Sequence, residues 1–427
     1  MARTHAKARR EPPAGRGGRG GARRAAPARP SPLADSNLRL IWRERRISRA
    51  EIARRTGLAR STVSEIVGDL FPTGLIAEVG VGPSRGGRPP MVLEFRDDAY
   101  AILGVDMGAA HVAVALTDLR GRVLAWEERS HPVRTDPEGT RALIVELCDR
   151  CLKAWRPGVR RLVGIGVAVP SPVDPRHPDH LSEVVLPEWK GSSGLSVLAE
   201  RYGVPLRVDN DANLGALAER WWGAGRDVED FAYIKLATGV GLGHVIGGRI
   251  YRGATGVAGE IGHLAIDPHG GPCICGLRGC LATFVGAPAL VARARALLDG
   301  RPDSTLAGRE VTIEAIEDAA LAGDALALSL VHEAAEHLGV AIAGLLNLMN
   351  PSLVVLGGGL ARLGDTLLAP LRETVRTRTL ISSLVACELR TSELGTRATA
   401  VGAATMVLEE ALSDSRLFPA ARGRRAR

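Results

Sequence analysis

Hydrophobic residues recur every three or four positions in three short segments near the start of the chain. This spacing predicts three helices, each with one buried face. The first covers 34–45, the second runs from Ser48 to just before Gly57, and the third covers 60–70. Such a compact set of short helices predicts a small separate domain at residues 32–95.

The ends of the second helix are marked by local signals. Ser48 and Glu51 have the spacing of a capping box, in which the hydroxyl accepts from the Glu51 amide and the carboxylate reaches back. Gly57 suits a left-handed C-cap. A short turn then leads to the third helix, whose predicted buried face leaves polar groups outward at its start: Arg60, Ser61, Thr62 and Ser64.

Two strand-like pieces, 75–79 and 91–95, flank a Gly/Pro-rich loop that carries Arg85 and Arg88. Helix, turn, polar helix start and hairpin together predict a winged helix-turn-helix. The third helix would read base edges in the major groove, and the two loop arginines would suit a narrow minor groove. The alternative is a generic three-helix bundle with a solvated charged face.

From residue 100 the pattern changes to alternating strands and helices. This alternation predicts mixed sheets covered by helices, in the α/β class. The expected strands are 101–106, 111–118, 122–126, 162–169, 206–209, 231–236 and 353–356. The expected helices are 140–155, 212–222, 325–349 and 397–412.

Charge changes the picture at the two ends. Residues 1–30 hold nine Lys or Arg against one acid, whereas the rest of the chain is close to neutral. Because this segment has almost no apolar side chains to bury, residues 1–31 are predicted to be a disordered basic tail. Such a tail would add contacts to DNA phosphates. The alternative is an inert extension or a misassigned start. Residues 413–427 are predicted to be a second flexible basic tail.

The apolar runs are too short to span a bilayer, and the basic N-terminus lacks the apolar stretch of a signal peptide. We therefore expect a cytoplasmic protein with no membrane partner. In that compartment cysteines are more often metal ligands or free thiols than disulfides. Cys148 and Cys151 fall in a predicted helix and are expected to be core or surface cysteines rather than a pair of metal ligands. Cys387 is expected to be a buried strand cysteine.

Four residues have the spacing of a closed metal shell. His263, Cys273, Cys275 and Cys280 supply one imidazole and three thiolates within eighteen positions, a set that favours structural zinc. The alternative is a loop of reduced cysteines.

Several motifs in the segment that follows the N-terminal domain together resemble the ROK (repressor, open reading frame, kinase) family of sugar kinases and sugar-responsive repressors. They are Gly-Val-Asp-Met-Gly (104–108), Val-Asp-Asn-Asp-Ala-Asn (208–213), Ala-Thr-Gly-Val-Gly (237–241), Gly-Ala-Thr-Gly-Val-Ala-Gly-Glu-Ile-Gly-His (253–263) and Cys-Ile-Cys-Gly-Leu-Arg-Gly-Cys (273–280). The resemblance implies an actin-like (ribonuclease H-like), two-lobed domain over 100–412. The N-terminal helices point to the repressor branch.

The resemblance also implies a sugar site between the lobes. Its residues would be Asn210, Asp211, Glu260 and His263, with Asp211 as catalytic base if the protein is a kinase. The alternatives are that Asp211 only caps the helix 212–222 and that Glu260 is a solvated loop acid. The loops that would face a nucleotide carry Asp106, Gly108, Thr238, Gly239 and Gly241.

Departures from the kinase pattern weaken the case for catalysis. Ala110 stands where the family's kinases have a threonine, and Ala237 and Leu242 replace glycines, so added side chains would hinder approach to phosphate. Ala282 replaces a sugar-binding glutamate. We therefore expect that ATP is not a cofactor and that phosphotransfer is lost.

These observations predict a sugar-responsive transcriptional regulator, most simply a repressor. Its expected partners are a double-stranded DNA operator and a sugar or sugar phosphate effector, and it would act as a homodimer or tetramer. Two alternatives stay open. One is a bifunctional sugar kinase that also binds DNA, and the other is a body that binds a transport or signalling protein instead of a sugar.

Overall fold

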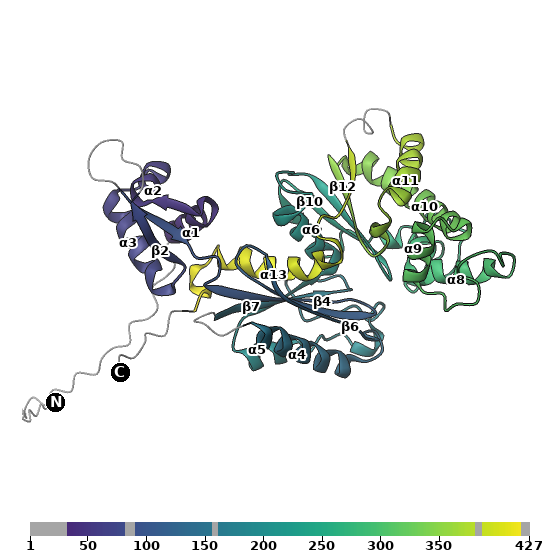
Figure 1. Cartoon of the computed structure of the whole chain (residues 1–427), viewed down its shortest axis with the longest axis horizontal. Helices are drawn as coiled ribbons and strands as arrows, with labels where there is room; N and C mark the ends of the chain where they lie inside the picture. The colour runs from purple at the N-terminus through teal and green to yellow at the C-terminus, as the bar shows by residue number, and fades with distance from the viewer. Residues whose placement is uncertain (1–31, 82–89, 156–160, 381–386, 420–427) are drawn as a thin grey trace, which may run out of the picture.

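The computed structural model describes residues 32–81, 90–155, 161–380 and 387–419. They form a small N-terminal domain at one end of the molecule and two larger lobes, each built on a five-stranded sheet (Figure 1). The loop that carries Arg85 and Arg88 lies outside the described residues, as does the predicted tail 1–31.

The N-terminal domain contains the three predicted helices and a three-stranded antiparallel sheet of order β1-β3-β2. Its helices are α1 (Pro32–Glu44), α2 (Arg49–Thr56) and α3 (Arg60–Leu70), and its strands are β1 (Arg46–Ser48), β2 (Ile76–Val81) and β3 (Met91–Phe95). A short 3₁₀ turn, Phe71–Thr73, follows α3. Strand β1 was not predicted, because three residues are too few to show a period.

The predicted caps of α2 are confirmed except for one half of the capping box. Ser48 Oγ accepts from the Glu51 amide at 3.2 Å, and Gly57 ends the helix with φ 70°. The Glu51 carboxylate does not follow the prediction: it binds the guanidinium groups of Arg54 and Arg55. These two cations compete better for a carboxylate than a neutral amide does.

The first lobe has the strand order β6-β5-β4-β7-β8, with β7 and β8 parallel to β4 and β5 antiparallel to both of its neighbours. The strands are β4 (Tyr100–Met107), β5 (His111–Thr117), β6 (Val123–Ser130), β7 (Arg161–Val169) and β8 (Leu206–Asn210). Helices α4 (Pro137–Ala154) and α5 (Ser196–Tyr202) cover its outer face, and a 3₁₀ turn spans Pro187–Trp189.

The second lobe has the strand order β11-β10-β9-β12-β13. The strands are β9 (Phe231–Leu236), β10 (Val240–Ile246), β11 (Arg249–Tyr251), β12 (Leu353–Gly358) and β13 (Glu388–Thr391). The helices that pack outside this sheet are α7 (Ala282–Val285), α8 (Ala287–Leu298), α9 (Ile313–Leu321), α10 (Ala325–Met349) and α11 (Asp365–Arg378), with 3₁₀ turns at Ile261–His263 and Leu360–Leu363.

Helix α10 is long and apolar enough to cross a membrane on length and composition alone, but 56% of its apolar window is buried inside the second lobe. A core helix of a large lobe meets the same criteria, so this helix gives only weak evidence for a membrane span.

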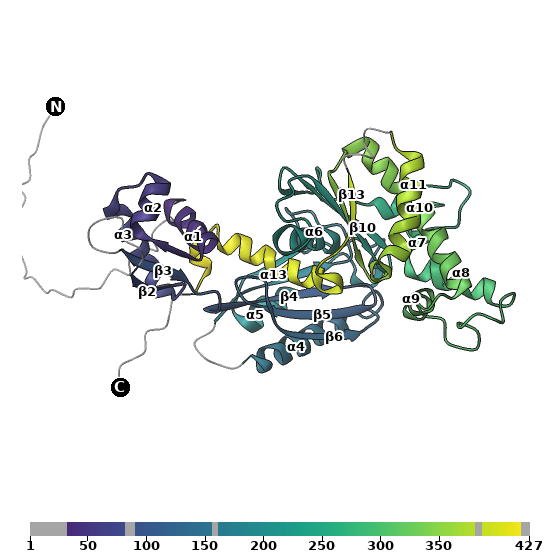
Figure 2. The same ribbon diagram turned by 45° about the horizontal axis from the view of Figure 1, so that its top comes forward.

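Two helices, α6 (Asp211–Trp222) and α13 (Ala398–Ala411), fill the space between the sheets (Figure 2). Glycines bring these layers unusually close. A Cβ added to Gly104 or Gly166 would lie about 2 Å from a carbonyl oxygen of α13, and one added to Gly402 would lie 1.8 Å from the Leu214 oxygen of α6. The order of layers is therefore first sheet, α13, α6, second sheet.

Two predictions near the C-terminus were wrong. The start of the segment predicted to be a flexible tail forms a 3₁₀ turn, Ser415–Leu417, and Phe418 is buried against Tyr100 with ring centroids 5.2 Å apart. A phenylalanine thus holds this part of the tail. Cys387 lies just before β13 and is half-buried rather than a buried strand residue.

Candidate functional site

A cavity of about 510 Å³ opens between the lobes at the N-terminus of α6. The four residues predicted to bind sugar all line it, although up to 53 positions separate them in sequence. The residues of interest on its wall are Gly108, His111, Arg134, Asn210, Asp211, Lys235, Ala237, Thr238, Gly239, Gly241, Glu260, His263 and Ala282.

Strand β8 ends at the cavity, and α6 begins there. Asn210 caps α6, since its Oδ1 accepts from the amides of Ala212 (3.0 Å) and Asn213 (3.1 Å) while its Nδ2 donates to the Ser171 carbonyl. The capping role considered for Asp211 therefore belongs to its neighbour. Asn210 keeps one N–H for a ligand, and the Asp211 carboxylate stands in the first turn of α6 on the cavity wall.

Lys235, which was not predicted as a site residue, joins the two lobes through ion pairs. Its Nζ lies 2.9 Å from Asp211 Oδ2 and 3.4 Å from Asp106 Oδ2. Burial alone would lower the pKa of Lys235, but the two carboxylates outweigh it and raise that pKa. Burial alone would raise the pKa of Asp106, yet Lys235 and His111 hold it at about 2.

The first predicted nucleotide-facing loop is covered by His111. A Cβ on Gly108 would lie 2.3 Å from the imidazole Cε1, so the ring sits directly on this glycine. His111 Nε2 is 3.5 Å from Asp106 Oδ2. Burial lowers the pKa of His111, but the Asp106 carboxylate reverses that effect, and the pKa is raised.

The second predicted nucleotide-facing loop lines the cavity with Thr238, Gly239 and Gly241. Ala237 also faces the cavity, as expected for a side chain that narrows a phosphate loop. Leu242 does not: its side chain is buried in the hydrophobic core of the second lobe. The predicted obstruction by Leu242 was wrong, because β10 alternates its residues and turns this one inward.

Glu260 and His263 lie at the other side of the cavity, on the loop after β11 and the 3₁₀ turn Ile261–His263. Burial and the nearby Asp211 charge raise the pKa of Glu260 to about 7. His263 Nε2 is 3.9 Å from Glu260 Oε2, while its Nδ1 is 3.4 Å from Cys273 Sγ. The two ring nitrogens therefore face two different groups.

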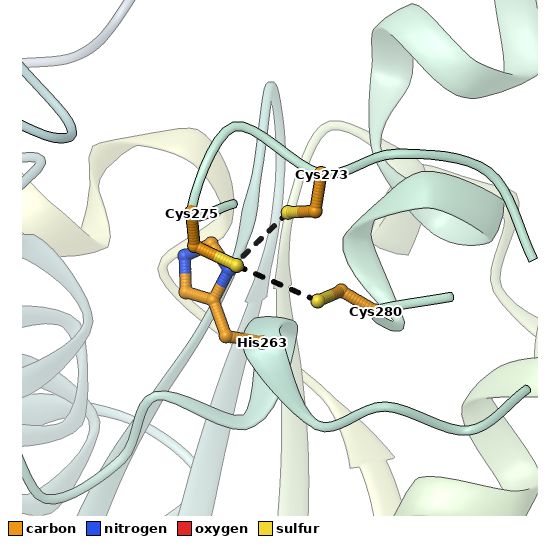
Figure 3. A group of neighbouring side chains, drawn as sticks. All are labelled: His263, Cys273, Cys275 and Cys280. Atoms are coloured by element: carbon orange, nitrogen blue, oxygen red, sulfur yellow. Dashed lines mark hydrogen bonds between the residues drawn. The ribbon is translucent and has the colours of Figure 1, made fainter. Parts of the chain in front are cut away.

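The four predicted metal ligands meet in one place, with their sulfurs and imidazole pointing toward one another (Figure 3). All four ligand atoms lie within 4.8 Å of one another, and Cys275 Sγ is 3.6 Å from Cys280 Sγ. Tetrahedral zinc–thiolate bonds would place sulfurs about 3.8 Å apart. Gly276 (φ 87°) and Gly279 (φ 63°) make the turns that allow this convergence. The cluster could hold a metal ion.

The start of α3 presents the polar groups predicted to face DNA. Arg60, Ser61 and Ser64 are exposed and Thr62 is partly exposed, while the apolar residues of this helix are buried. Among the described residues Arg60 has no ion-pair partner. Several other arginines of the domain do, including Arg46 with Glu94 and Arg49 with Glu78.

Fold and site together define a two-lobed, sugar-kinase-like body that carries a winged helix-turn-helix. Residues 102–410 match the ROK family model, and residues 38–70 match a winged helix-turn-helix DNA-binding model. The chain belongs to the ROK family.

Among curated proteins, the chain is 33% identical to a putative xylose repressor of Caldicellulosiruptor sp. over 383 residues, covering 88% of this chain and 95% of that one. It is also 33% identical to the DNA-binding transcriptional dual regulator NagC of Escherichia coli K12, over 86% of this chain and 90% of that one.

Solved structures place the same fold in both branches of the family. A ROK family transcriptional regulator, described as a homologue of the E. coli MLC protein, superposes with a TM-score of 0.76 at 28% identity, covering 90% of this chain and 97% of that one. A ROK family glucokinase from Streptomyces griseus, in complex with glucose and AMPPNP, superposes with a TM-score of 0.64 at 29% identity. This match covers 72% of this chain and 98% of the glucokinase chain.

The metal cluster gives the first testable prediction. Purified protein should contain one divalent metal ion per chain, and Cys275→Ser should lose it, because removing one thiolate opens the tetrahedral shell. Cys387→Ser, a cysteine outside the cluster, is the matched control and should keep the metal. Elemental analysis of the three proteins measures this, and metal-free wild-type protein would contradict it.

Proposed function

We propose that this protein is a cytoplasmic transcriptional regulator, a repressor that binds an operator and is released by a sugar or sugar phosphate. The observation that carries the proposal is that one chain holds an exposed, polar recognition helix and an interlobe cavity lined by hydroxyl-binding groups. An effector acts only through different affinities for two states, and lobe closure supplies two such states.

The composition of the cavity favours a polyol as effector. Asn210, Asp211 and Glu260 offer amide and carboxylate groups to adjacent hydroxyls. Ala282 leaves room at one end, which suits a phosphorylated or substituted sugar as well as a free one. Relatives that carry the names putative xylose repressor and N-acetylglucosamine repressor support an effector of this class.

The same cavity is poorly suited to phosphoryl transfer. Lys235 already pairs with Asp211, the residue that would take the proton from a sugar hydroxyl, and His111 lies on Gly108, where a phosphate would approach the backbone. Phosphoryl transfer depends on positioning and on stabilising charge, so both features oppose it. We infer that ATP is not a cofactor.

We propose zinc as the metal of the cysteine cluster, in a structural role, because three thiolates and one imidazole with no open position are its typical closed shell. His263 would bind it through Nδ1 and keep Nε2 toward Glu260. The metal would thereby fix the loop that carries a cavity residue.

On DNA we propose a homodimer or tetramer whose N-terminal domains contact two half-sites. Arg60, Ser61, Thr62 and Ser64 of α3 would face the major groove. Arg85 and Arg88 would reach the minor groove from the wing, as the sequence predicts.

DNA binding is tested at Arg60. Arg60→Ala should weaken binding to a selected operator by about 1–3 kcal/mol if the guanidinium reads a base edge. Arg376→Ala, which removes the same charge from α11 in the second lobe, should leave affinity unchanged. Gel-shift titration on DNA fragments recovered by the wild-type protein provides the measurement. Equal affinities for the two variants would refute the assignment.

The effector site is tested at Glu260. Glu260→Ala should still bind the operator but should no longer be released by the sugar that releases wild type, because a hydroxyl partner is gone. Glu336→Ala, an exposed acid on α10, is the control and should respond normally. Gel shifts across D-xylose, D-glucose and N-acetylglucosamine, each free and phosphorylated, measure the response. If none of these sugars released wild-type protein from the operator, the proposed function would be refuted.

The rival function, a bifunctional kinase, rests on the presence of Asp211 in the cavity. A coupled assay over the same sugars with ATP should show no turnover. Turnover at ordinary kinase rates, about 1–100 per second, that Asp211→Asn abolished would establish the rival. A body that binds a signalling protein instead would show no sugar binding in calorimetry.

A further inference from the structure

Helix α6 connects the cavity with the N-terminal domain. Its first residue, Asp211, lines the cavity, and its last two, Trp221 and Trp222, contact Trp42 on α1. A helix of 12 residues is about 18 Å long. One element therefore touches both the effector cavity and the domain that carries the recognition helix.

The far end of α6 forms a tryptophan cluster of Trp42, Trp221 and Trp222. The ring centroids are 5.4 Å apart for Trp42 and Trp221, 6.3 Å for Trp42 and Trp222, and 5.5 Å for the two neighbours on α6. The indole of Trp222 donates to Thr405 Oγ1 of α13 at 2.8 Å. The cluster therefore joins α1, α6 and α13 at one point.

One group in this cluster is poorly satisfied. Among the described residues, the Trp221 indole N–H is buried without a hydrogen-bond partner. A buried donor with no acceptor disfavours the arrangement that contains it relative to one that supplies an acceptor or water. A shift of α6 that brought an acceptor or water to the Trp221 N–H would relieve this cost.

Between its ends α6 is enclosed by its neighbours. All eight residues from 212 to 219 are buried, and Gly215 lies against the Tyr233 ring of β9. Near its C-terminus the buried Glu219 accepts hydrogen bonds from the amides of Ala224 and Leu394. A helix enclosed on every side transmits a displacement along its axis instead of absorbing it by bending.

The N-terminal domain is held to the first lobe by other contacts. Trp42 Nε1 donates to the Leu119 carbonyl at 2.9 Å, and Arg120 lies 4.3 Å above the Trp42 ring while its Nε binds Asp97. The Tyr100 hydroxyl donates to the Thr73 carbonyl. Because the domain is fixed to the first sheet, any shift of α6 against that sheet acts on Trp42.

We propose that α6 is the element that couples effector binding to DNA affinity, with the tryptophan cluster as its contact on the DNA-binding domain. A sugar that binds at Asn210 and Asp211 shifts the N-terminus of α6, and the cluster passes the shift to α1. This inference rests on the proposed function, and it adds the path by which the cavity controls the N-terminal domain.

The test compares coupling, defined as the ratio of operator dissociation constants with and without the releasing sugar. A typical coupling is on the order of 5–150-fold. Trp221→Leu and Trp42→Leu should reduce the ratio to below about twofold while calorimetry shows unchanged sugar affinity of the DNA-free protein. Trp126→Phe, on β6 and stacked with Arg397, is the control and should keep the wild-type ratio.

The outcomes distinguish a failure of the proposed function from a failure of the coupling role of α6. If wild type is released by no sugar of the panel, the proposed function fails and this inference falls with it. If wild type is released and both leucine variants are released by the same factor, the proposed function stands and α6 is not the coupling element. Thermal melting of each variant checks that it is folded.

A second measurement needs no change in the cluster. In a chain with Trp126→Phe, Trp155→Phe and Trp189→Phe, selective excitation of tryptophan reports on the tryptophan cluster alone. The releasing sugar should shift its emission maximum, since the environment of Trp221 changes. An unchanged spectrum at a sugar concentration that releases the operator would overturn the proposal even if the leucine variants failed to fold.

Discussion

The close packing of α13 against the first sheet is the constraint on which the rest of the structure depends. Gly104 and Gly166 leave no room for a Cβ beneath the carbonyls of Ala400 and Ala403, so strand and helix backbones are in direct contact. Overfilling such a contact destabilises a protein and shifts its backbone. Gly402 repeats the arrangement toward α6. The lobes thereby meet through two helices, and the cavity forms where α6 begins.

Charge at the cavity follows from that approach of the lobes. Asp106 lies on β4 of the first sheet and Lys235 on β9 of the second, and burial makes each costly without the other. An internal ammonium group thus lies between the carboxylates of Asp106 and Asp211. The charges that meet where the two lobes approach are therefore balanced by groups of the chain itself.

Much of this was predictable from the sequence because the signals were local. The helices of the N-terminal domain were marked by Ser48 and Gly57, and the metal cluster by the spacing from Cys273 to Cys280. Contacts between distant segments left no such local signal, and the convergence of Asn210, Asp211, Glu260 and His263 on one cavity was expected only from the family resemblance. The only signal for Lys235 was a lysine inside the apolar strand Phe231–Leu236, and nothing local showed which carboxylates it would meet. The Trp221–Trp42 contact likewise joins residues 179 positions apart, beyond the reach of any periodicity.

The loop that carries Cys273, Cys275 and Cys280 is marked by a local spacing of cysteines, and it also lines the interlobe cavity. Within it, Cys273 N donates to the Leu277 carbonyl, but Ile274 and Leu277 are exposed, so the loop has little apolar packing of its own. Ligand bonds can replace that missing core, since metal binding contributes to folding free energy directly. Because His263 turns one nitrogen to the cysteines and the other to Glu260, a metal ion bound there would also restrain the cavity wall. One imidazole ring thus links the cysteine loop to the interlobe cavity.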